Sequence, residues 1–209
     1  MLKRAVLILF LVVILAGGVF AQAPISLSAG GGMILGGGLG NSHKGGPQDQ
    51  TSKSTYLNFG FVGFFDMTYA EVSTSIIFGS GSWSASNNTW NGGGSFETTS
   101  ISLGLLGKYP FFLNSSLAIF PALGLNYNIC ILHKENGYKS DKPFERSGFS
   151  LNIGGGLDYS FNESIYLRGL TLYNLGFPNK HDKDTADRYG LDVTLGHGFV
   201  LKVLIGFRF

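Results

Sequence analysis

The sequence predicts an all-β fold, a transmembrane, antiparallel, up-and-down β-barrel of eight strands. Glycine is abundant, at 32 of 209 residues, and aromatic residues make up 14% of the chain. Charged residues reach only 13%, about half the usual share of a soluble domain. Apolar and small polar residues alternate with a period of two, as in strands whose two faces meet different surroundings. Long and short connections alternate along the chain, as in membrane barrels.

The first 23 residues predict export. A short basic segment, Met1–Arg4, precedes an apolar run from Ala5 to Phe20, and Ala21-Gln22-Ala23 matches a signal-peptidase site. Cleavage after either alanine satisfies the rule, so both positions stay open. The run is shorter than the roughly 20 apolar residues that cross a bilayer as a helix. We expect a cleaved signal peptide over 1–23 and one barrel domain over 24–209.

The charge balance argues against a nucleic-acid partner. Loss of Lys3 and Arg4 reduces 15 basic residues to 13, which equals the 13 acidic residues, so the mature chain is formally neutral. Binding to nucleic acid or to an acidic surface calls for a basic excess. The single cysteine, Cys130, has no partner for an internal disulfide.

The strand pattern is clearest between residues 147 and 160, where apolar residues take one parity and small or polar residues the other. A helix would scatter the same residues around its circumference. After the leader, no segment has the length and apolar content of a spanning helix, and a closed barrel is the other structure that satisfies its backbone in lipid. We expect eight strands, near 25–39, 55–65, 68–79, 97–107, 116–131, 147–159, 164–176 and 198–209.

The connections predict the orientation of the barrel. Long extracellular loops are expected at 40–54, 80–96, 132–146 and 177–196, and short periplasmic turns at 66–67, 107–115 and 160–163. The segment Leu191–Leu195 also alternates. We interpret it as an extension of the final hairpin, but a full strand within 189–196 would raise the count to ten. Pro121 lies inside an expected strand, where a bulge is the usual consequence.

The last nine residues, Leu201 to Phe209, carry a resemblance to a known group. With the leader and the alternating connections, they resemble the small bacterial outer-membrane barrels of the OmpX and OmpW type. The resemblance implies an outer-membrane location among its lipids. It also implies an assembly signal, formed by Val203, Ile205, Phe207 and Phe209, that the barrel-assembly machinery reads. The composition rich in glycine and phenylalanine is also similar to that of small spirochaetal barrels.

Charged residues on the inward parity are the best candidates for a site. Asn58, Asn126, Asn128 and Asn152 share this parity with five charged residues, Glu71, Asp158, Arg168, Lys202 and Arg208. The interior of an eight-stranded barrel is just wide enough for side chains to fill. A buried charge without a partner is costly. We therefore predict that Glu71 pairs with Arg168 or Lys202 and plugs the lumen.

Cofactor, metal and catalytic motifs are not apparent. Glycine runs at 30–32 and 36–40 lack the strand–helix context of a nucleotide site. The four histidines, His43, His133, His181 and His197, lack the spacing of a zinc site. A nucleophile–base pair is also not apparent, so an enzyme is the least favoured hypothesis.

Two functional hypotheses remain. The first is a structural or surface-interaction barrel, expected to be a monomer, whose long loops bind a host or surface ligand. The alternative is a narrow, porin-like channel for small, hydrophobic solutes, as resemblance to OmpW implies. The state of the lumen separates the two hypotheses.

Overall fold

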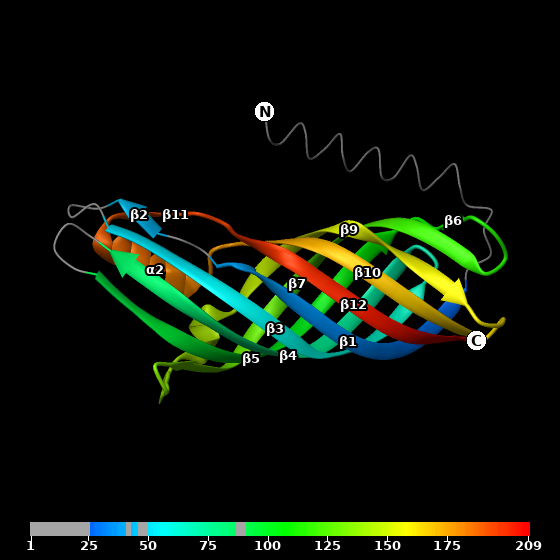
Figure 1. Cartoon of the computed structure of the whole chain (residues 1–209), viewed down its shortest axis with the longest axis horizontal. Helices are drawn as coiled ribbons and strands as arrows, with labels where there is room; N and C mark the ends of the chain where they lie inside the picture. Colours follow the sequence, from blue (N-terminus) through cyan, green and yellow to red (C-terminus); the bar gives the residue numbers. More distant parts are fainter. Residues whose placement is uncertain (1–25, 41–42, 46–49, 87–90) are drawn as a thin grey trace, which may run out of the picture.

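The computed structural model describes residues 26–40, 43–45, 50–86 and 91–209 (Figure 1). The expected signal peptide lies outside the described residues. Within them, eight long strands form a closed antiparallel ring, because the first long strand pairs with both the second and the last. Their ring order is β1 (Leu27–Leu39), β3 (Gln50–Met67), β4 (Ala70–Ser86), β5 (Asn91–Lys108), β7 (Leu117–Glu135), β9 (Gly148–Ser160), β10 (Ile165–Gly176) and β12 (Gly196–Arg208). The predicted eight-stranded, up-and-down barrel is confirmed.

The surplus segment is not a full strand, so the ten-stranded alternative is wrong. Its strand part is β11 (Leu191–Val193), which pairs with β2 (His43–Gly45), and β2 in turn pairs with β3. The segment therefore joins the hairpin of β1 and β3 instead of extending the final one. Two further short strands, β6 (Phe111–Phe112) and β8 (Tyr138–Lys139), pair with β7.

The fourth expected loop contains a helix, α2 (Lys180–Tyr189). Asn179 begins it with a capping box to Asp182, and Gly190 ends it at φ 63°, in the left-handed region. A 3₁₀ turn, η1 (Pro143–Arg146), lies in the third loop. Among the described residues, no helix is long and apolar enough to cross a bilayer. Figure 1 shows α2, β2 and β11 together at the end of the barrel opposite the C-terminus.

The two faces of each strand differ as the alternation predicts. On β3, outward Phe61 is 59% exposed, whereas its inward neighbour Val62 is 4% exposed. Similar outward apolar residues encircle the barrel, including Leu35, Ile76, Leu105, Leu125, Ile153 and Val203. Glycine permits close packing of the ring, since a Cβ at Gly32 of β1 would overlap the carbonyl oxygen of Val203 on β12. An apolar belt of this extent needs lipid around it.

The barrel wall has two heights. The neighbouring strands β3, β4, β5 and β7 have 18, 17, 18 and 19 residues, whereas the other four have 12 or 13. A membrane strand needs only about 9–11 residues. Above the outward Phe78, β4 continues with the outward, exposed Ser80, Ser82, Ser84 and Ser86. We call the extension formed by residues 50–56, 80–86, 91–97 and 133–135 the polar wall.

The polar wall corrects three expected loops. Residues 50–54, 80–86, 91–96 and 133–135 are strand, not loop. Their outward residues are polar or glycine because this face of the extension lies above the membrane and meets water, so the apolar parity that marks a spanning strand is missing. The pairing of β4 with β5 continues without this apolar alternation, from Gly79 opposite Thr98 up to Ser86 opposite Asn91.

Pro121 does not produce the expected bulge. It pairs with Gly155 in an unbroken β7–β9 register. Its carbonyl oxygen accepts from Tyr109, so its nitrogen also points to the side where β5 ends and β6 begins, away from the β7–β9 ladder. The register shift lies between Thr99 and Ser100, where β7 carries Ile131 as an extra residue.

Candidate functional site in the barrel interior

Arg168 of β10 lies at the centre of the interior and is 1% exposed. Its Nε and Nη2 donate to the two carboxylate oxygens of Asp158 on β9, each at 2.7 Å. Its Nη1 donates to Glu71 Oε2 on β4 at 2.6 Å, and Nη2 also donates to Asp66 Oδ2 on β3 at 2.9 Å. One guanidinium therefore joins three carboxylates from three strands, a fork geometry for which arginine is suited.

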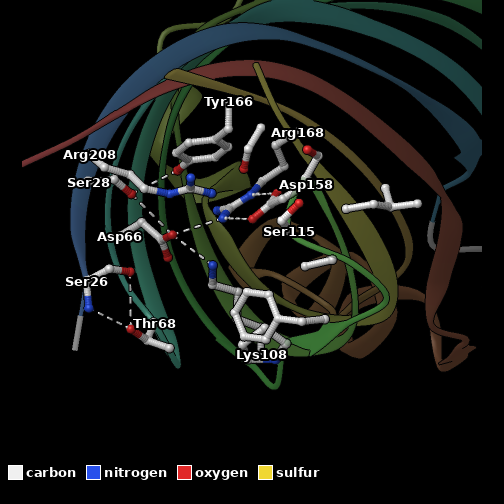
Figure 2. A pocket seen from close by; sticks show the side chains of 16 residues that line it. Ser26, Ser28, Asp66, Thr68, Lys108, Ser115, Asp158, Tyr166, Arg168 and Arg208 are labelled. Carbon is white, nitrogen blue, oxygen red and sulfur yellow. Dashed lines mark hydrogen bonds and ion pairs between the residues drawn. The ribbon is translucent and has the colours of Figure 1, made fainter. Parts of the chain in front are cut away.

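Lys108, the last residue of β5, extends this network. Its ammonium lies 2.8 Å from Asp66 Oδ2, which also accepts a long bond of 3.4 Å from Ser28 Oγ. Figure 2 shows the side chains of Arg168, Asp158, Asp66 and Lys108 turned toward one another inside the ring. We call the group of Asp66, Glu71, Lys108, Asp158 and Arg168 the ion-pair network.

Aromatic and aliphatic side chains enclose the network. The Arg168 guanidinium carbon lies 5.2 to 5.5 Å from the ring centres of Phe64, Phe120 and Tyr166, within cation–π range. Farther along β10, inward Leu170 and Leu172 pack with Leu106, Phe120 and Ala122 in a buried cluster. Both parities of β10 are apolar because the inward residues of this strand fill the interior. Above them, Asn174 Nδ2 donates to Asn152 Oδ1 at 2.7 Å.

The structure brings together three of the five predicted lumen residues, namely Glu71, Asp158 and Arg168. Lys202 is also buried and faces inward, but the ion pair of Glu71 is with Arg168. Arg208 is the last residue of β12 and lies toward the end that carries the short turns, with its guanidinium carbon 4.7 Å from the centre of the Tyr166 ring. The predicted assembly residues Val203, Ile205, Phe207 and Phe209 are exposed on the outer face.

Two members of the network were missed. Asp66 and Lys108 were assigned to turns because the strands were expected to stop at 65 and 107. Strand parity was the available signal. Asp66 shares the even parity of inward Asn58 and Gly60, and Lys108 that of Ser102 and Gly104. Extending each strand by one residue would have placed both charges inside the barrel.

A cavity of about 230 Å³ lies beside the network at the end that carries the short turns. Arg168, Asp66, Lys108 and Arg208 line it, together with Tyr166 and the serines of neighbouring strands and turns (Figure 2). Charged and hydroxyl groups form part of the cavity lining, whereas the cluster of Leu106, Leu170 and Leu172 is apolar. Among the described residues, no three His, Cys, Asp or Glu side chains come together as metal ligands would.

A second polar cluster lies at the other end, above the apolar belt. His133 of β7 faces inward and is 4% exposed, one residue before Lys134, which pairs with Glu97 at 3.1 Å on the polar wall. Neither ring nitrogen of His133 has a hydrogen-bond partner among the described residues. Burial, and then the charge of Arg146, lowers the pKa of His133 to about 4.

Arg146 connects η1 to its neighbours in this cluster. Its guanidinium lies 3.6 Å from Glu135 of β7, and its carbonyl accepts from Asn179 at the start of α2 at 3.5 Å. Burial lowers the pKa of Arg146. The ammonium of Lys180 on α2 lies 2.9 Å from Glu145 of η1. The third and fourth loops are thus joined to each other over β7.

Comparison with known proteins gives a fold but no family. No protein-family model and no curated protein matches the sequence. The outer membrane protein OprG from Pseudomonas aeruginosa matches with a TM-score of 0.51 at 12% identity, over 88% of this chain and 96% of that one. The chain has the fold of a small outer-membrane β-barrel. This fold and the apolar outer belt place it in the bacterial outer membrane.

Two further likenesses have TM-scores below 0.5. Neisserial surface protein A matches with a TM-score of 0.45 at 12% identity, over 85% of this chain and 96% of that one. Ail, the attachment invasion locus protein of Yersinia pestis, was solved with the heparin analogue sucrose octasulfate. It matches with a TM-score of 0.32 at 16% identity, over 88% and 99% of the two chains.

Proposed function

We propose that this protein is a non-conducting outer-membrane barrel whose polar wall and joined loops present a surface to a partner outside the cell. The observation that carries the proposal is the closure of the interior by Arg168. Its guanidinium crosses the ring from β10 to Glu71 on β4, with Asp158 and Asp66 on either side. A channel would require ions to pass this network and the apolar cluster around Leu170.

The polar wall supports the surface role. Its four strands extend beyond the length that a bilayer requires, and they remain paired with one another instead of ending in loops. Paired strands are a stiffer support for a binding surface than free loops, since the backbone hydrogen bonds are already made. Rigid support for contact residues is the usual design of binding sites on scaffolds.

Electrical recording tests the closed interior against the porin-like alternative. Refolded protein is inserted into a planar bilayer, with a general porin as the positive control for insertion and detection. We expect no ohmic steps from this protein. Steps of uniform size that scale with salt concentration would overturn the proposal and favour the channel.

A shortened wall tests the surface role. Gly81 and Phe96 face each other on β4 and β5, so a two-residue Asn-Gly turn can replace residues 82–95 and close the hairpin lower down. Cells that display the full and shortened barrels at equal levels are compared for adherence to surfaces coated with extracellular-matrix proteins. We expect the shortened barrel to lose adherence. Equal adherence would contradict a binding role for the wall.

A further inference from the structure

The cavity at the periplasmic end lies beside a cation that the ion-pair network does not neutralise. We infer that this cavity binds a small oxyanion, with Arg208 as the residue that recognises it. The inference goes beyond the proposed surface function, which concerns the opposite end of the barrel.

The charges of the lower interior do not balance. The inward carboxylates there are Asp66, Glu71 and Asp158, and the inward cations are Lys108, Arg168, Lys202 and Arg208. Three acids therefore face four bases. In a confined interior, an excess cation attracts an anion more strongly than it would in open water.

The excess charge can be assigned to Arg208. Arg168 and Lys108 are ion-paired with the three carboxylates, and of the two remaining cations, Lys202 and Arg208, it is Arg208 that lines the cavity. Among the residues that the structure describes, no carboxylate lies within ion-pair distance of Arg208. Its guanidinium instead lies over the face of Tyr166, and that ring is held by a 2.9 Å bond between Tyr166 Oη and Ser28 Oγ. Stacking on a fixed ring orients the guanidinium and leaves its N–H donors available.

The cavity wall supplies further donors of the appropriate kind. The serines Ser115 and Ser116 of the β6–β7 turn and Ser160 at the end of β9 line the same space as Arg208. Figure 2 shows Arg208, Ser115 and Arg168 around one opening. A guanidinium with several hydroxyls matches the oxygens of a phosphate or carboxylate, since arginine binds such groups with paired N–H donors.

Two sources supply this chemistry at the periplasmic end. One is a free oxyanion from the periplasm, and the other is the phosphate of a lipid headgroup in the inner leaflet. Both would place their oxygens against Arg208, so the experiment needs arms that separate them.

Inorganic phosphate is the probe in the first arm. It is titrated at constant ionic strength into the full barrel in a non-ionic detergent, and amide NMR shifts of Ser115, Ser116 and Ser160 are followed. We expect saturable shifts in the wild type and in the control Arg188→Gln, which changes an exposed arginine on α2. Arg208→Gln should weaken binding at least about tenfold, the loss expected for a charged hydrogen-bond donor. Arg208→Lys, which keeps the charge, should retain part of the binding.

The second arm repeats the titration in nanodiscs of phosphatidylcholine and in discs of an uncharged glycolipid. Weaker phosphate binding in the phospholipid discs alone would support the site and identify the lipid headgroup as its occupant. Equal binding in both would support a free oxyanion. The inference is overturned if no saturable shift occurs in detergent, or if Arg208→Gln binds phosphate as well as the wild type while its spectrum shows a folded barrel.

Discussion

Arg168 and Asp158 face each other directly across β10 and β9, and their side chains form a two-point ion pair with both bonds at 2.7 Å. The hairpin of these two strands therefore carries its own neutral pair. The remaining donor groups of Arg168 reach Glu71 and Asp66 on the far side of the ring. The same guanidinium that pairs locally also ties β10 to β4 and β3, so it should contribute to closure of the barrel.

Replacement of Arg168 by methionine should destabilise the barrel strongly. Glu71 and Asp158 would then lose their ion-pair partner in a buried position, whereas Asp66 would keep Lys108. Removal of one partner from a buried ion pair costs about 3–5 kcal/mol, because the remaining charge lacks compensation. The free energy of unfolding, measured by urea titration in lipid vesicles, should fall by that amount. The double variant Arg168→Met with Glu71→Gln should recover part of the loss.

The matched control is Arg188→Met on the exposed surface of α2. A surface change of this kind usually alters stability by less than about 0.5 kcal/mol. If the two methionine variants unfold at the same urea concentration, the network does not stabilise the barrel as the geometry implies.

Gly206 of β12 offers a test of packing beside the network. A Cβ at this position would overlap the ring of Tyr166, which is buried and bonded to Ser28. We expect Gly206→Ala to cost about 1–3 kcal/mol, the usual penalty for overpacking a filled core. The control is Gly63→Ala on the outward face of β3, where the nearest atom, Gly30 O, would be 3.9 Å from the new Cβ. Equal unfolding free energies for the two variants would show that Tyr166 can move aside.

Much of the spanning fold was predictable because a membrane imposes one simple pattern. Residues such as Phe61 and Val203 must face lipid, so their strands alternate clearly, and parity alone placed Glu71, Asp158 and Arg168 on the inner face. The pairing of Glu71 with a specific cation needed the relative heights of strands far apart in sequence. Strand heights in a barrel depend on the shear of the ring, which local patterns do not encode.

The pattern fails where a strand face loses its usual surroundings. Ser82 and Ser84 point outward above the membrane, where they meet water and not lipid, so their strand resembles a loop in sequence. Leu170 and Leu172 face a filled interior, so β10 is apolar on both faces. Helix α2 was overlooked although its Asn179–Asp182 capping box and Gly190 stop are readable signals.

Acidification should weaken the end of the barrel that carries the polar wall, through His133. Its pKa is lowered to about 4 in the folded protein, first by burial and then by the charge of Arg146, whereas an unfolded histidine titrates near 6.5. Between these two values the unfolded chain binds a proton that the folded chain does not. The free energy of unfolding must therefore fall as the pH decreases from about 6.5 to 4, and His133 adds no further loss below that range.

Urea titrations across this pH range, for the wild type and His133→Leu, isolate the contribution of His133. We expect the variant to lose part of the slope, and His181 to retain some of it, because burial and Arg146 lower its pKa as well. A slope unchanged in His133→Leu would contradict the assignment.

Phe209 should matter for assembly more than for stability. It is 80% exposed at the end of the barrel, and its backbone nitrogen donates to Leu27 at 3.1 Å whatever its side chain. Phe209→Leu should change the free energy of unfolding by less than about 1 kcal/mol. If the terminal aromatic residue is an assembly signal, the same variant should enter the outer membrane of cells more slowly, as followed by pulse labelling and heat-dependent gel mobility.

The control is Phe199→Leu, which alters another outward phenylalanine at the other end of β12. This variant should assemble at the wild-type rate. Equal delays in both variants would show that the terminal position has no special role, because the change would then act through general loss of aromatic surface.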